Sequence, residues 1–168
     1  RDLLEFVRSR LGSSLPIEPK PMNLADAARE AIAEACAGRP DCQVHLHTDG
    51  DTQGQWDRGR IDQLLQNLIG NALQHGLNGQ APTLSLDGTA DSVELRMHNF
   101  GPPIPQAALG TVFDPLVRSA TEELGSNSTS LGLGLFIVKE VVQAHRGTIE
   151  VASSEAGGTT FTVVLPRR

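Results

Sequence analysis

Residues 61–76, IDQLLQNLIGNALQHG, constrain the fold more than any other stretch of the sequence. Their apolar residues recur every three or four positions, which predicts an amphipathic helix with one buried stripe. Asn67, Asn71 and Gln74 form a second stripe, because at roughly 100° per residue they project within about 60° of one another. A solvated helix face would explain one such Asn. Since Asn is a poor helix former, two in register indicate a functional surface.

The rest of the chain divides into short elements around this helix. Asp57 is a suitable N-cap for it, and Asn23 is one for an earlier helix with a small apolar face. The pattern further predicts strands at residues 43–48, 83–87, 93–98, 148–153 and 159–165, a polar turn at 49–55, a short helix at 106–112, and a helix that follows Leu131 and ends at Gly147. This order favours an α/β sandwich with a mixed sheet and helices on one face.

Three segments are expected to lie outside this compact unit. Residues 1–11 have the pattern of the end of an amphipathic helix, and residues 13–21 contain three prolines and are typical of a linker. Because the chain opens in a helical pattern without Met, we expect it to be a fragment of a longer protein. Residues 113–130 end in a polar tract that cannot offset the entropy of ordering, which predicts a mobile loop.

Composition excludes several classes of function. A net charge of −6 over 168 residues argues against nucleic acid as a partner, and no apolar run is long enough to span a membrane. Cys36 and Cys42 lack C-x-x-C spacing, so we expect free thiols in a reducing compartment. His45 and His47 share one face of a predicted strand. Without a third ligand at motif spacing, an exposed polar face is favoured over a metal site.

Gly132 and Gly134 lie in LGLGL, immediately before the last predicted helix. Glycines let a backbone approach a ligand closely, and the first N–H groups of a helix attract anions. Alone, LGLGL is explained equally well by close packing of the helix on the sheet, and it matches neither a P-loop nor a dinucleotide fingerprint.

Taken in order, five motifs resemble the ATP-binding catalytic domain of sensor histidine kinases, a Bergerat fold shared with gyrase-type ATPases. They are the N box at residues 62–75, the G1 box at 99–105, the F box at 113–118, the G2 box at 130–135, and the closing pattern HRGTIEVASSEAGGTTFTVVLP. The resemblance implies a two-layer sandwich with a mostly antiparallel mixed sheet and about three helices on one face. It further implies that residues 16–168 form the catalytic domain with an ATP lid at about 113–131, and that residues 1–15 end the dimerisation and His-phosphotransfer helix.

The resemblance also assigns roles to individual residues. Asn67 corresponds to the Asn that binds Mg²⁺ and supports catalysis, Asn71 lies near the phosphates, and Asn99 corresponds to the residue that accepts from the adenine amino group. Arg118 in the lid would neutralise charge on the γ-phosphate. The remaining residues of the implied ATP site are Gln74, His75, Gly101, Ile104, Leu131, Gly132, Leu133, Gly134 and Leu135.

Several residues depart from the family pattern. Asn99 replaces an Asp, Gln74 replaces a phosphate-contacting Lys, Ser130 replaces the first Gly of the G2 box and Leu116 replaces the second Phe of the F box. Asn99 can still accept from the adenine amino group but without charge, which predicts weaker adenine selectivity, and the charge missing at Gln74 predicts modest nucleotide affinity. The changes at Ser130 and Leu116 are mild. Gln63 stands where hydrolysing relatives carry a Glu, which favours phosphoryl transfer over hydrolysis, although Gln63 is equally well explained as a good helix former.

None of the five histidines is followed by an acidic residue, as the phosphoacceptor His of this family is. The resemblance therefore implies a kinase domain that binds ATP or ADP with Mg²⁺ and phosphorylates a His on a separate domain of the same homodimeric protein, for onward transfer to a response regulator receiver domain. It implies a cytoplasmic domain that does not itself contact the membrane, in a parent protein that could be membrane-anchored. The alternatives are a degenerate docking module of the same fold and an independent ATPase of the superfamily.

Overall fold

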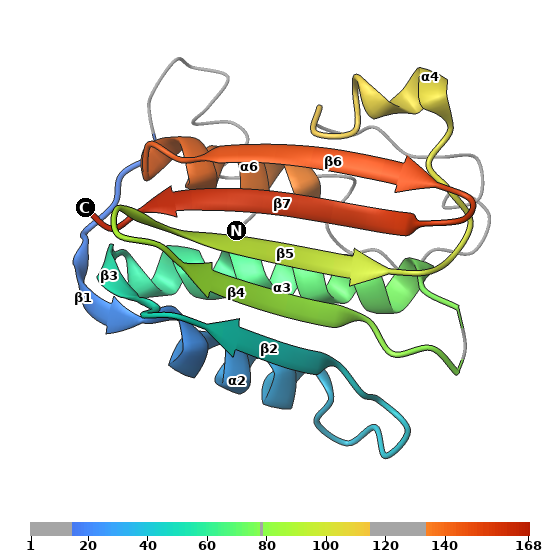
Figure 1. Cartoon of the computed structure of the whole chain (residues 1–168), viewed down its shortest axis with the longest axis horizontal. Helices are drawn as coiled ribbons and strands as arrows, with labels where there is room; N and C mark the ends of the chain where they lie inside the picture. The colour runs from blue at the N-terminus through green and yellow to red at the C-terminus, as the bar shows by residue number, and fades with distance from the viewer. Residues whose placement is uncertain (1–14, 78, 115–133) are drawn as a thin grey trace.

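A five-stranded mixed sheet with a layer of helices on one face forms the body of the chain in a computed structural model that describes residues 15–77, 79–114 and 134–168 (Figure 1). The strands of this sheet are ordered β2-β4-β5-β7-β6, and β1 and β3 form a separate two-stranded ribbon. The elements are β1 Lys20–Asn23, α2 Leu24–Ala35, β2 His45–Asp49, β3 Gln53–Trp56, α3 Arg58–His75, β4 Thr83–Gly88, β5 Ser92–Asn99, α4 Gln106–Leu109, α6 Gly134–Ala144, β6 Thr148–Ser154 and β7 Gly158–Pro166. The predicted fold class is confirmed.

The sheet is mixed because one of its pairings is parallel. β2 pairs with β4 in parallel, with His45 opposite Thr83, whereas β4, β5, β7 and β6 pair antiparallel. The two hairpins join β4 to β5 and β6 to β7, as the alternating sequence pattern predicts. In β5 every second residue is buried, so one face of the sheet meets the helices and the other carries mostly polar side chains.

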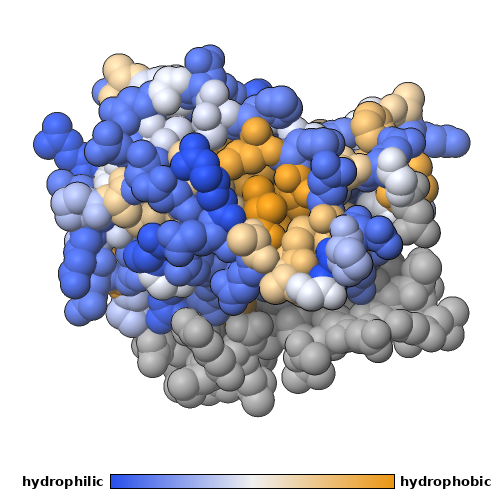
Figure 2. Space-filling view, turned by 90° about the horizontal axis from the view of Figure 1, so that it is seen from below, coloured by the Kyte–Doolittle hydropathy of each residue, from blue (hydrophilic) through white to orange (hydrophobic). Residues whose placement is uncertain are grey.

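The core lies between this sheet and helices α2, α3 and α6, which pack side by side behind it (Figure 1). In α3 the fully buried residues belong to the predicted apolar stripe, namely Ile61, Leu64, Leu65, Leu68, Ile69 and Ala72. The alanine-rich face of α2 permits close packing on α3. Figure 2, seen from the side of α2 and β2, shows apolar side chains gathered near the middle of a mostly hydrophilic face. Within the described residues no helix is long and apolar enough to cross a bilayer.

Both predicted N-caps are confirmed. The Asn23 side chain accepts a hydrogen bond from the backbone N–H of Ala25, and the Asp57 carboxylate accepts one from Arg60. These bonds satisfy N–H groups that have no partner within the helix.

Several predictions need correction. Residues 49–55 are not only a turn, because β3 begins at Gln53 and pairs with β1, which itself begins inside the predicted linker. The first strand of the large sheet begins at His45 rather than at residue 43, and the helix predicted at residues 106–112 ends at Leu109. The helix expected at residues 1–11 and nearly all of the expected lid fall outside the described residues.

The prediction of free thiols is wrong, because Cys36 and Cys42 form a disulfide. Two successive turns between α2 and β2 bring the cysteines together, and their spacing in the sequence does not reveal those turns. His45 and His47 are exposed on β2, as expected. In the part of the chain that the structure describes, no group of three His, Cys, Asp or Glu side chains could hold a metal ion.

Candidate functional site

The second half of α3 carries the polar stripe, which consists of Asn67, Asn71 and Gln74. Asn67, Asn71 and His75 are half-buried and Gln74 is exposed, whereas Leu68 and Ala72 between them are buried. The polar stripe therefore turns away from the core while the apolar stripe of the same helix anchors it. This arrangement places the Asn67 and Asn71 amides along one line of the helix, away from its apolar stripe.

The start of α6 lies near the same level along α3 as this stripe. Helix α6 ends where α3 begins, since the backbone N–H of Asp57 donates to Nε2 of His145 at 3.0 Å, and the two helices pack on each other. The 11 residues of α6 rise about 16 Å, and the same distance along α3 from Arg58 reaches roughly residue 68. Gly134 and Leu135 therefore lie near the level of Asn67 and Asn71.

Asn99, the last residue of β5, is only 5% exposed. Its Nδ2 donates to the carbonyl of Phe100 at 3.2 Å, and within the described residues its Oδ1 accepts no hydrogen bond. A buried acceptor without a donor is costly in a folded chain and is usually found where a ligand or water supplies the donor. This atom can therefore accept a hydrogen bond from a donor group of a ligand.

The chain after Asn99 folds over the C-terminal end of α3. The backbone N–H of Leu77 donates to the carbonyl of Phe100 at 2.9 Å. A methyl group at Gly101 would collide with the backbone carbonyl of His75, so only glycine permits this approach. Asn99, Gly101 and His75 are thus brought together from two elements.

Two hydroxyl residues complete this corner. The backbone N–H of Ile104 donates to Oγ of Ser153 at 2.9 Å, and that oxygen lies 2.7 Å from Oγ1 of Thr159. Thr159 is buried and pairs with Asn99 in the β5–β7 register. Sequence reasoning assigned no role to either hydroxyl residue, although both lie within the closing pattern that it singled out.

Charged side chains are scarce at these positions. Oε1 of Gln63, one turn before Asn67, accepts a bond from Nη1 of Arg60 at 3.3 Å. Farther back, Arg58 joins α3 to α2 through Asp62 at 2.9 Å and Glu30 at 3.0 Å. The hydrogen bond to Asp62, followed by the one to Glu30, raises the pKa of Arg58 above its ordinary value.

Of the predicted site residues, Arg118, Leu131, Gly132 and Leu133 lie outside the described residues.

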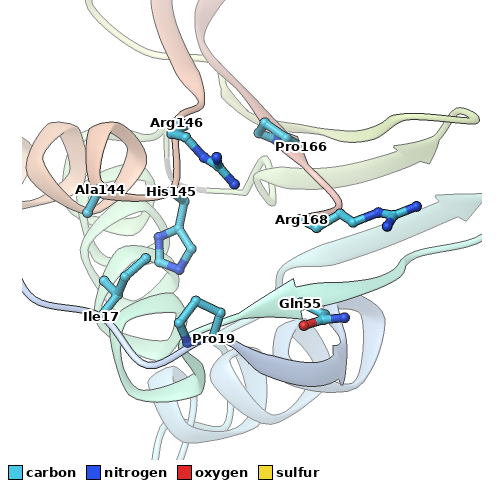
Figure 3. Close-up of a pocket in the computed structure, with 8 residues that line it drawn as sticks. All are labelled: Ile17, Pro19, Gln55, Ala144, His145, Arg146, Pro166 and Arg168. Atoms are coloured by element: carbon cyan, nitrogen blue, oxygen red, sulfur yellow. The ribbon is translucent and has the colours of Figure 1, made fainter.

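A hollow lies at the opposite end of α6 from the candidate site (Figure 3). It has a volume of about 230 Å³, and its lining includes Ile17 and Pro19 of the N-terminal segment as well as His145. His145 is buried and points toward those two residues (Figure 3). Because its Nε2 accepts the Asp57 N–H, its Nδ1 carries the proton and donates to the carbonyl of Val141 at 2.9 Å. This corner joins the two site helices but contains none of the predicted site residues.

Residues 56–168 match the family described as histidine kinase-, DNA gyrase B- and HSP90-like ATPases. The chain belongs to this family. It is 36% identical over 159 residues to a probable sensor histidine kinase of Mycobacterium tuberculosis, TcrY, covering 94% of this chain and 33% of that protein. It is 34% identical over 170 residues to the Escherichia coli sensor histidine kinase CusS, covering 99% of this chain and 34% of that protein. The chain thus spans about a third of each of these relatives.

Solved structures give the same assignment. The mycobacterial sensor histidine kinase MprB superposes with a TM-score of 0.75 at 26% identity, covering 90% of this chain and 99% of that one. The catalytic domain of the histidine kinase ThkA gives a TM-score of 0.74 at 25% identity, covering 90% of this chain and 98% of that one. This histidine kinase-like domain therefore has the catalytic, ATP-binding domain fold that the five motifs predicted.

Proposed function

We propose that this domain binds Mg-ATP between α3 and α6 and presents the γ-phosphoryl group to a His on a separate domain, from which it passes to an Asp of a response regulator. The observation that carries the proposal is the buried Oδ1 of Asn99, which has no donor among the described residues and lies beside Gly101. Membership of the histidine kinase-like ATPase family supports ATP as the ligand.

Each site residue then has a chemical task. Asn99 would accept a hydrogen bond from the adenine amino group, and Gly101 and Ile104 would let the chain approach the base. His75 and Gln74 would lie beside the nucleotide, and Asn71 near the phosphates. The residues 131–135 would enclose the triphosphate with backbone N–H groups at the start of α6. Arg118 would supply the positive charge that the described site residues lack.

Asn67 would hold Mg²⁺ through its side-chain oxygen. An amide oxygen is a suitable ligand for this hard cation, which keeps several waters and otherwise binds phosphate oxygens. When bound, Mg²⁺ neutralises phosphate charge and orients the γ-phosphate. The domain would contribute mainly positioning, because a nitrogen of the acceptor His attacks the γ-phosphorus as the bond to the ADP oxygen breaks. Gln63 cannot take a proton from water, which disfavours hydrolysis as the competing reaction.

The partners follow from this assignment. We place residues 1–15 at the end of the dimerisation and His-phosphotransfer helix and residues 16–168 in the catalytic domain. The whole protein would be a homodimer whose kinase domain is cytoplasmic, whether or not the parent is anchored in a membrane. Neither nucleic acid nor the membrane surface is expected to contact this domain.

Calorimetric titration with MgATP and MgADP tests nucleotide binding. We expect heat of binding for both, and for Asn67→Ala a loss of the dependence on Mg²⁺ while metal-free ADP still binds. Gln66→Ala, at the neighbouring position on α3, is the control and should retain that dependence. Absence of binding at millimolar nucleotide would refute the proposal.

A docking module without catalysis is the second candidate, because Asn99 and Gln74 both lack the charge of the family residues they replace. Labelled ATP added together with the upstream His-bearing domain separates the two functions. A kinase labels that domain, whereas a docking module leaves it unlabelled. Steady phosphate release by the chain alone would instead indicate an ATPase.

A further inference from the structure

The loop between α2 and β2 holds its two cysteines together through the backbone. The N–H of Arg39 donates to the carbonyl of Cys36, and the N–H of Cys42 donates to the carbonyl of Arg39, both at 3.0 Å. These turns set the two cysteine Cα atoms 5.2 Å apart, a separation that a disulfide spans without backbone movement. Since neither hydrogen bond involves sulfur, the turns should persist when the disulfide is reduced, and the pair can form again.

Cys42 also lines a groove of about 470 Å³. One wall of the groove is the cysteine loop, with Arg39 and Asp41, and the other is the C-terminal end of α3, with Leu73 and Gly76. Both cysteine residues are half-buried. Cys42 lines the groove, whereas Cys36 packs against the core, so a thiol that enters the groove would meet Cys42 first.

The far wall of this groove is continuous with the candidate nucleotide site. Gly76 lies next to the G1 box: a methyl group on it would be in ordinary van der Waals contact with Cβ of Asn99 at 3.6 Å and with the carbonyl oxygen of Phe100 at 3.7 Å. The next residue, Leu77, donates its N–H to that same carbonyl at 2.9 Å. Residues 72–77 therefore separate the cysteine loop from Asn99 by a single layer of chain.

We propose that Cys36 and Cys42 form a reversible thiol–disulfide site whose oxidation state changes nucleotide affinity through residues 72–77. The coupling rests on the proposed nucleotide-binding function, whereas the redox chemistry of the pair does not. Disulfides inside cells are commonly transient and redox-sensing, and the kinase domain proposed above would be cytoplasmic. The oxidised form should bind nucleotide more tightly, because the cross-link restricts the motion of the loop that forms the opposite wall of this groove, and residues 72–77 then have less conformational freedom to lose on binding.

Reduction is an exchange with a dithiol. One thiolate of the dithiol attacks Sγ of Cys42, the Cys36–Cys42 bond breaks, and Cys36 leaves as a thiolate that takes a proton from solvent. The second thiol of the dithiol then displaces Cys42 from the mixed disulfide. Two electrons and two protons pass to the protein, and the dithiol is oxidised to its own disulfide. An external disulfide such as oxidised glutathione reverses the exchange.

Redox titration of the full chain tests the site itself. The chain is equilibrated in glutathione buffers from fully reduced to fully oxidised, free thiols are alkylated, and the products are weighed by mass spectrometry. We expect one two-electron transition within this range. In single variants, Cys42 of Cys36→Ser should form the mixed disulfide with glutathione faster than Cys36 of Cys42→Ser. A pair that stays oxidised in reduced glutathione, or reduced in oxidised glutathione, overturns the proposal.

Calorimetry with ADP then tests the coupling. The oxidised chain should bind at least about fivefold more tightly than the reduced chain, the lower end of typical coupling between two sites. The double variant Cys36→Ser/Cys42→Ser should bind like the reduced chain and ignore oxidant. Cys36→Ala/Cys42→Ala replaces it if circular dichroism shows misfolding. Equal affinity of both redox forms overturns the coupling. Absence of binding in both forms refutes the proposed function and the coupling, while the titration still decides the thiol–disulfide site.

Discussion

Replacing Asn99 by Asp should tighten the binding of adenine nucleotides. Asn99 is 5% exposed, and its Oδ1 has no donor among the described residues, so a ligand amino group would meet an empty acceptor. A hydrogen bond to a charged group contributes about 1.5–3 kcal/mol, against about 0.5–1.5 kcal/mol for a neutral one. The gain of about 1–1.5 kcal/mol corresponds to roughly fivefold to tenfold tighter binding.

The same substitution should destabilise the nucleotide-free domain. A carboxylate loses the hydrogen bond from Nδ2 to the Phe100 carbonyl and must be buried with its charge, at a cost of about 1–3 kcal/mol. Burial disfavours the charged form and would raise the pKa of the introduced carboxyl in the folded state. The loss of stability should therefore be small below about pH 4, where the carboxyl is protonated in both states, and should grow as pH rises through the raised pKa.

Calorimetry with ADP and GDP and urea unfolding at two pH values measure these effects. Gln143→Glu makes the same charge change at an exposed position of α6 and should alter neither affinity nor stability. The preference for ADP over GDP should rise in N99D, because a carboxylate cannot donate to the guanine O6 as an amide can. If folded N99D binds ADP no more tightly than the native chain, Asn99 does not accept from the adenine amino group.

Three further substitutions test the framework of the site by chemical unfolding followed by circular dichroism. His145→Phe should lower the free energy of unfolding by about 1–3 kcal/mol, because the Asp57 N–H loses its acceptor; a change below about 0.5 kcal/mol would contradict the bond. Gly101→Ala should destabilise the domain and weaken ADP binding, since its methyl group collides with the His75 carbonyl, and an unchanged midpoint would exclude that contact. Arg167→Met removes a guanidinium that donates to three backbone carbonyls and should lower the free energy of unfolding by about 1–3 kcal/mol. An unchanged midpoint would show that hydrogen bonds to water replace those bonds without loss of stability.

The helix at residues 61–76 was predictable because its determinants are local. Burial of an apolar stripe at helical period needs only a surface to pack on, and Ile61, Leu65 and Ile69 are buried as that period requires. Asp57 was likewise recognisable as a cap from its position before the stripe. Asn67 and Asn71 were located by the same periodicity. Their proposed roles rest on the family resemblance.

Strand β3 was not predictable from its own residues. Its sequence QGQW has no alternating apolar pattern, and its pairing with β1 is set by contacts distant in sequence. Trp56 is buried beneath Gly54, where any larger residue would collide with the indole ring, and its Nε1 donates to the carbonyl of Pro166 at 2.8 Å. The lone tryptophan of the sequence was the one local sign that this segment is anchored.

Asp57 shows how a local signal can understate the role of a residue. Its carboxylate caps α3 through Arg60, but its other oxygen accepts the N–H of Glu18 at 2.8 Å, and its own N–H binds His145 at the end of α6. Helices α3 and α6 carry residues of the candidate site at their far portions, so their relative position there depends on this junction. The N-terminal segment joins the same junction through the N–H of Glu18, at the start of the helix that carries Asn67. Only the fold brings these three elements together, which is why the sequence could predict the cap and not the junction.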